Sequence, residues 1–149
     1  MQKITVNTGR DSFILLDRII QAETQLIRGI KTFKNETAYL GIESLAQLGA
    51  FHVRYITDFK RHAFLLKINQ CLMPSQTVLH GIYHLSGVLV SWSDSAFSYE
   101  LQARKEGRVQ IEGAFLFATV DYDRHFKQEI IQQHYRDVFS CLQNVTKEE

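Results

Sequence analysis

The stretch Leu40-Gly41-Ile42-Glu43-Ser44-Leu45-Ala46-Gln47 begins the segment that decides the fold. From here onward, apolar residues recur at steps of three and four, which predicts one helix over roughly Gly41 to Tyr55. Because apolar residues cover more than half of its girth, we expect a curved sheet to wrap around this helix. The recurring apolar positions are Leu40, Ile42, Leu45, Ala46, Gly49, Val53 and Ile56.

Three polar residues, Glu43, Gln47 and Arg54, fall on another line of the same helix. A buried helix rarely carries a carboxylate unless that group is paired, hydrogen-bonded or functional. A plainer interpretation of Glu43 is stabilisation by the positive end of the helix dipole. Gln47 would equally suit a buried backbone group, and Arg54 a surface position or a carboxylate partner.

The composition is that of one globular domain, residues 1–149. Of the 149 residues, 45% are hydrophobic and 22% are charged, which suffices for a substantial core. The formal net charge of +1 gives no argument for binding nucleic acid or an anionic membrane. No apolar signal core and no membrane span is recognisable, so we expect a cytoplasmic protein.

The two cysteines, Cys71 and Cys141, lie far apart and outside any Cys-x-x-Cys spacing. They are interpreted as reduced, at least partly buried thiols. His80 and His84 lie four residues apart, but a metal site would need a further ligand that the sequence does not place. We expect no metal and no cofactor.

The remainder of the chain is mostly extended and ends in a second helix. Phe13 to Ile20 is interpreted as a helical turn leading into a first strand, and Glu106-Gly107 as a tight turn. Residues Met73 to Gln76, with the single proline, predict another turn. Gly113 is interpreted as a bulge or a close backbone approach. The further strands are expected at Gln25–Phe33, Ala63–Leu72, Thr77–Trp92, Phe97–Arg104 and Val109–Val120.

From about Arg124 to Gln143 the apolar period returns to that of an amphipathic helix. This helix would cover an open edge or face of the sheet, or pack on a second subunit. Helices segregated to one face of an antiparallel sheet predict an α+β domain. The apolar residues of this helix are Phe126, Ile130, Ile131, Val138, Phe139 and Leu142.

This order of elements, together with three motifs, resembles the hotdog fold and more narrowly the 3-hydroxyacyl-[acyl-carrier-protein] dehydratases. The resemblance spans roughly Ser12 to Val120, so the hotdog core would be residues 12–120. Its motifs are Phe13-Ile14-Leu15-Leu16-Asp17-Arg18-Ile19, Gly41-Ile42-Glu43-Ser44-Leu45-Ala46-Gln47, and Ala63-Phe64-Leu65-Leu66 continuing to Met73-Pro74.

The chain departs from that family where the catalytic histidine should stand. The family has a Gly- and Pro-rich loop with a His shortly before the acidic helix, whereas Gly29 to Tyr39 contains neither His nor Pro. The loop is also shorter. In this respect the chain resembles the predicted dehydratase branch associated with aryl-polyene-type clusters more closely.

The resemblance implies a reaction on 3-hydroxyacyl thioesters of acyl carrier protein or coenzyme A, in fatty-acid or polyketide-type metabolism. Dehydration needs a base for the α-proton and an acid for the leaving hydroxyl. By resemblance, Glu43 is the acid–base residue, and Gln47 orients it or a water. Amides at the helix start, near Gly41 and Ile42, would bind the thioester oxygen. Tyr39 is the residue nearest in sequence that could act as the second acid.

The other histidines differ in whether they could replace the missing one. His52 follows Glu43 by nine residues, points to the opposite side of the helix and cannot pair with Glu43 in the same subunit. His62 is interpreted as facing solvent, and His80 and His84 share one face of a strand. His125 and His134 belong to the expected second helix.

Three functions remain open at this point. The first is a dehydratase-like hydro-lyase, and the second a non-catalytic acyl-binding or partner subunit of a dehydratase complex. The third is a hotdog thioesterase, in which a carboxylate activates water and needs an open route for it. The resemblance further implies a homodimer or higher oligomer that binds acyl chains between subunits.

Overall fold

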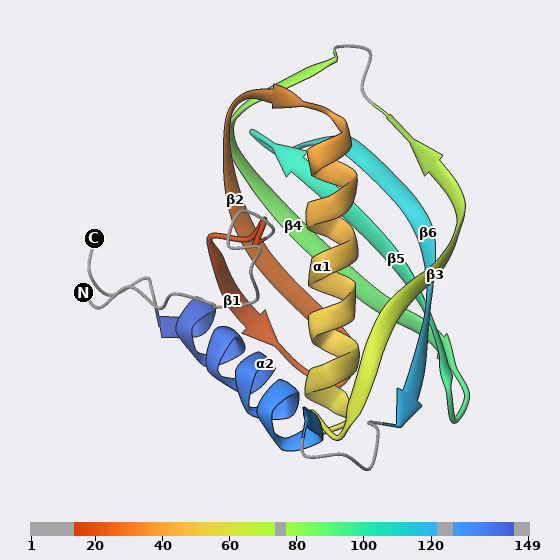
Figure 1. Cartoon of the computed structure of the whole chain (residues 1–149). Helices are drawn as coiled ribbons and strands as arrows, with labels where there is room; N and C mark the ends of the chain where they lie inside the picture. Colours follow the sequence, from red (N-terminus) through yellow and green to blue (C-terminus); the bar gives the residue numbers. More distant parts are fainter. Residues whose placement is uncertain (1–13, 74–76, 122–126, 145–149) are drawn as a thin grey trace.

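The computed structural model describes residues 14–73, 77–121 and 127–144. Six strands and two helices follow one another along this part of the chain (Figure 1). They are β1 (Arg18–Ala22), β2 (Leu26–Thr37), α1 (Tyr39–Ile56), β3 (Arg61–Leu72), β4 (Val78–Trp92), β5 (Ala96–Lys105), β6 (Arg108–Asp121) and α2 (Lys127–Asn144).

The strands form one antiparallel sheet in the order β1-β2-β4-β5-β6-β3. The sheet curves around α1, which lies along its concave face (Figure 1). This arrangement confirms the expected α+β architecture, a curved sheet wrapped around one long central helix.

Strand β4 shows how the side-chain period creates the two faces of the sheet. Its residues Leu79, Tyr83 and Leu85 are buried against α1, whereas His80 and His84 are exposed on the outer face. The turn between β5 and β6 uses Glu106 and Gly107 with φ of 53° and 79°, the left-handed pair that suits a two-residue hairpin. The predicted turn at Glu106-Gly107 is therefore confirmed.

Small residues allow α1 to lie close to the sheet. A Cβ added to Gly49 would meet the Phe117 ring, and one added to Gly41 would meet Ile111 and Leu79. Gly113 on β6 marks a close approach of backbones, because an added Cβ would collide with the Gln70 carbonyl oxygen. The register of β3 against β6 shifts at the same place, between Ile68 and Gln70.

The segment before β1 is not the helical turn expected from the sequence. Residues 14–16 have no regular structure, and the strand starts at Arg18. The extended path is fixed by hydrogen bonds: the Leu15 amide donates to Gln47 Oε1 (2.8 Å), and the Thr32 amide donates to Asp17 Oδ2 (2.6 Å). Phe13 and the expected turn around Pro74 lie outside the described residues.

Strand β2 extends beyond the expected Gln25–Phe33, to Thr37. The extension passes an irregularity between Phe33 and Glu36, where Asn35 has a φ of 56°. At this point the Lys34 amide donates to Glu36 Oε2 (3.0 Å). This side-chain bond therefore stabilises the irregular part of β2 before α1 begins.

Helix α2 packs against the C-terminal half of α1 and beside β1 (Figure 1). The Phe139 ring stacks on Tyr55 with 5.4 Å between ring centroids and also contacts Phe59. The expected apolar stripe is correct for Val138, Phe139 and Leu142, which are buried. It is wrong for Ile130 and Ile131, which are exposed because the helix meets the domain through its later turns.

Candidate functional site

A groove runs along the side of α1 that faces away from the sheet. Its volume is about 500 Å³. Because the α1 residues of its lining recur at helical steps, the groove follows the helix axis. They are Glu43, Ala46, Gln47, Ala50, Phe51 and Arg54, and the walls add Ile14, Ala63, Phe64, Leu65, His134 and Tyr135.

Glu43 lies at the end of this groove nearer the helix start, and its side chain is exposed to solvent. The sequence places this carboxylate on a helix that the sheet should wrap, but the Glu43 side chain is not buried in the single chain. The sheet-facing side of α1 is taken up by Gly41, Leu45 and Leu48, so Glu43 faces outward. Its carboxylate nevertheless borders an apolar groove and is open to water.

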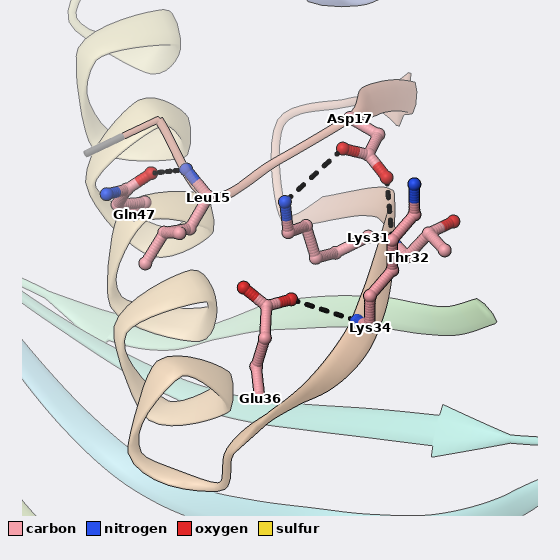
Figure 2. A network of polar contacts seen from close by, with 7 residues as sticks. All are labelled: Leu15, Asp17, Lys31, Thr32, Lys34, Glu36 and Gln47. Atoms are coloured by element: carbon pink, nitrogen blue, oxygen red, sulfur yellow. Dashed lines mark hydrogen bonds and ion pairs between the residues drawn. The ribbon is translucent and has the colours of Figure 1, made fainter. Parts of the chain in front are cut away.

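Gln47 lies one turn after Glu43 and lines the same groove. Figure 2 shows its side chain reaching the segment before β1, where Oε1 accepts the Leu15 amide. The interpretation of Gln47 as a partner of a backbone group is therefore confirmed. This bond also fixes Ile14, one residue earlier, as part of the groove wall.

A second set of polar contacts holds the same segment against β2. Asp17 accepts the Thr32 amide, and its other oxygen lies 3.5 Å from Lys31 Nζ (Figure 2). The Asp of the N-terminal motif thus has a structural partner. Together with the Gln47 contact, it positions one wall of the groove.

Tyr39, Gly41 and Ile42 form the first turn of α1, next to the groove but outside its described lining. Tyr39 is 74% exposed, and its amide donates to Thr37 Oγ1 at 3.2 Å. The Gly41 amide donates to the Ala38 carbonyl at 3.0 Å. Gly41 is buried, whereas Ile42 is half-buried.

His52 is wholly buried on the side of α1 opposite Glu43, as the helical spacing predicted. Its Nε2 lies 2.6 Å from the Glu23 carbonyl oxygen and its Nδ1 2.5 Å from the Tyr99 hydroxyl. The carbonyl can only accept, so Nε2 carries the proton and Nδ1 accepts from Tyr99. Burial lowers the pKa of His52 and raises that of Tyr99, so both stay neutral and serve the core.

The other histidines divide between the outer surface and the groove. His80 and His84 lie on the exposed face of β4, away from α1. His62 was expected to face solvent but is half-buried, with its ring centroid 6.2 Å from that of Tyr135. Burial, with the Arg54 charge as a smaller cause, lowers the pKa of His62. His134 lines the groove, and His125 lies outside the described residues.

The far end of the groove is aromatic and cationic, which the sequence did not predict. Arg54 is only 6% exposed, its Nη2 donates to the Ala63 carbonyl at 2.8 Å, and its guanidinium lies 3.9 Å from the centre of the Tyr135 ring. The expected surface position of Arg54 is therefore wrong, because β3 and α2 pack over the last turns of α1. The spacing of Tyr135, Val138, Phe139 and Leu142 would have placed Tyr135 on the buried side of α2.

Within residues 14–73, 77–121 and 127–144, no three His, Cys, Asp or Glu side chains are grouped so that they could hold a metal ion. Both cysteines, Cys71 and Cys141, are free and half-buried. Neither described helix combines the length and apolar character needed to cross a bilayer.

Comparison with known proteins shows similarity of structure alone. No family model and no curated protein matches the sequence. A thioesterase from Haemophilus influenzae superimposes with a TM-score of 0.64 at 10% identity, covering 83% of this chain and 96% of that one. The dehydratase heterocomplex ApeI:P from Xenorhabdus doucetiae gives 0.62 at 13% identity, covering 87% and 99%.

A hypothetical thioesterase from Streptococcus pneumoniae, solved with coenzyme A, gives a TM-score of 0.60 at 11% identity, covering 70% of this chain and 85% of that one. Identities this low establish the architecture and no more. The chain has the hotdog fold, with α2 as an additional C-terminal helix.

Proposed function

We propose that this protein binds acyl thioesters in the groove along α1 and hydrolyses them with Glu43 as the general base. One observation carries the proposal: the Glu43 carboxylate is open to water at one end of a groove whose walls are largely apolar. Apolar walls suit the acyl chain. The exposed carboxylate suits the activation of water.

In the proposed reaction Glu43 takes a proton from water while the water oxygen bonds to the thioester carbonyl carbon. The tetrahedral intermediate then collapses, the carbon–sulfur bond breaks, and the proton passes to the leaving thiolate. Gln47 would orient the water through its amide nitrogen while its oxygen holds Leu15. The positive end of the first turn of α1, Tyr39 to Ile42, would face the thioester oxygen.

Dehydration of a 3-hydroxyacyl thioester is the second candidate, and the structural similarity to the ApeI:P dehydratase heterocomplex supports it. In this alternative, Glu43 removes the α-proton and a second acid protonates the leaving hydroxyl. His134 lines the same groove but lies at the end opposite Glu43, so it does not supply that acid in the single chain.

We further propose that two copies pair through β3. This strand ends the sheet and has β6 as its one neighbour in the described structure. More than half of its exposed side chains are apolar, and an apolar edge strand is a template for pairing with another chain. Because Phe64 and Leu65 also line the groove, a second copy at this edge would cover part of it. The exposed apolar residues of this edge are Phe64, Leu65, Leu66, Ile68, Leu72 and Met73.

The test is to incubate the protein with saturated acyl-, 3-hydroxyacyl- and enoyl-coenzyme A, and with the same acyl groups on acyl carrier protein. Released thiol and enoyl absorbance are both followed. Cys71 and Cys141 contribute thiols of their own, so protein without substrate sets the baseline. We expect thiol release, and we expect Glu43→Gln to lower its rate about 100-fold or more, the usual contribution of a positioned base.

Glu112→Gln is the matched control, because Glu112 is an exposed carboxylate on β6 outside the groove. It should retain the wild-type rate. Gain or loss of enoyl absorbance without thiol release would favour the dehydratase. Binding without either reaction would favour the non-catalytic subunit, and an active Glu43→Gln enzyme would overturn the site.

A further inference from the structure

Helix α2 contributes two residues to the lining of the groove, at the end far from Glu43. His134 and Tyr135 of α2 line the groove there. They lie beside Phe51 and Arg54, which belong to the last turns of α1. Glu43 lies at the opposite end, on the second turn. Between these ends the lining consists largely of apolar side chains: Ile14, Ala46, Ala50, Ala63, Phe64 and Leu65.

Tyr135 is held firmly at this end by rings and charge on several sides. Its ring packs edge-on against Phe51, with centroids 6.2 Å apart and an interplanar angle of 76°. The Arg54 guanidinium lies over its face at 3.9 Å, and the His62 ring stands 6.2 Å away. Four residues further along α2, Phe139 packs against Phe51 and Tyr55. These contacts hold the Tyr135 ring in place at this end of the groove.

The distance between the two ends of the groove limits the length of the acyl chain that it can hold. Eight residues separate Glu43 from Phe51, which is about 12 Å along a helix axis. An extended hydrocarbon chain advances about 1.25 Å per carbon, given bonds of about 1.5 Å. The apolar part of the groove is therefore long enough for about ten carbons.

Taking the proposed function as its premise, we propose that Tyr135 sets the upper limit of acyl-chain length and that the ligands are medium-chain acyl thioesters. The thioester lies near Glu43, and the methyl end of the chain lies against Phe51 and Tyr135. Each methylene up to the limit adds about fourfold to affinity through burial of apolar area. Carbons beyond this length limit would contact no apolar wall of the groove and would gain no affinity from burial.

The experiment measures the affinity of saturated acyl-coenzyme A from four to sixteen carbons by calorimetry, a readout that does not require turnover. For the wild-type protein, we expect affinity to rise to a maximum near about ten carbons and to fall for longer chains. Tyr135→Ala should move the maximum to longer chains and strengthen binding of the sixteen-carbon ligand at least tenfold. Ala50→Leu fills the groove floor and should move the maximum to shorter chains.

Gln133→Ala is the matched control on the exposed side of α2 and should leave the length profile unchanged. Ala50→Leu keeps the test decisive if Tyr135→Ala does not fold. A length maximum that neither Tyr135→Ala nor Ala50→Leu moves would overturn the role of α2 while leaving the proposed function intact. Failure of every acyl-coenzyme A to bind, with the four- to sixteen-carbon acyl carrier protein thioesters equally inert, would instead remove the proposed function.

Discussion

At the scale of single residues, His52 joins three parts of the molecule. It is carried by α1, accepts a hydrogen bond from Tyr99 on β5, and donates to the Glu23 carbonyl between β1 and β2. The neutral imidazole satisfies both partners, and burial of the ring disfavours its charged form. Protonation of His52 is therefore opposed by the fold.

This opposition predicts that stability falls as the pH drops. In the folded protein the pKa values of His52 and His62 lie below the ordinary 6.5, so below that pH the unfolded chain binds more protons than the folded one. The free energy of unfolding should decrease from about pH 7 downward, by at most about 1.4 kcal/mol per pH unit for each group. Urea denaturation at a series of pH values measures this decrease in the free energy of unfolding.

Two variants assign this pH dependence to its sources. His52→Gln and His62→Gln should each reduce the slope, because each removes one group whose pKa differs between the two states. A slope that is the same in wild type and in both variants would show that these histidines are not its cause.

The positions of the candidate site residues were partly predictable from the sequence. Helical spacing placed Glu43, Gln47 and Arg54 on one side of α1 and His52 on the other, because that geometry is local. The burial of Arg54 and the exposure of Glu43 were not predictable. Both depend on how β3 and α2 pack over the helix, which no period within α1 encodes.

At the scale of elements, α2 covers the last turns of α1. Phe139 is its central anchor, with ring contacts to Phe51, Tyr55 and Phe59. Because its side chain is buried, its loss would leave a cavity between the two helices.

We predict that Phe139→Ala lowers the free energy of unfolding by about 3–5 kcal/mol, the usual cost of such a truncation. Ile130→Ala is the control, since Ile130 is 61% exposed on the same helix and its truncation should cost less than about 0.5 kcal/mol. Chemical denaturation of both variants gives the comparison. Equal losses would mean that α2 does not anchor through Phe139.

Strong local patterns predicted most elements well. The alternation in β4, the Glu106-Gly107 turn and the spacing in α1 each gave the correct element with small errors at the ends. The segment before β1 was predicted as a helical turn because it is a short apolar run. Its extended path depends on Asp17 and Leu15 bonding to partners on β2 and α1, which lie far away in the sequence.

At the scale of the whole molecule, the two edges of the sheet differ in how far they are covered by other elements. Strand β1 has α2 beside it, whereas the outer edge of β3 carries a run of exposed apolar side chains. The most prominent is Leu66, 57% exposed near the middle of the strand. Pairing of two β3 strands would continue the sheet across both copies and bury this run.

We therefore predict that the protein is a dimer of about twice its 17.3 kDa chain mass, and that Leu66→Asp makes it a monomer. Ile82→Asp is the matched control, because Ile82 is also 57% exposed but lies on the outer face of β4. Light scattering after size-exclusion chromatography distinguishes the two masses. A wild-type monomer would refute pairing through β3, and dissociation by Ile82→Asp but not by Leu66→Asp would move the interface to the outer face of the sheet.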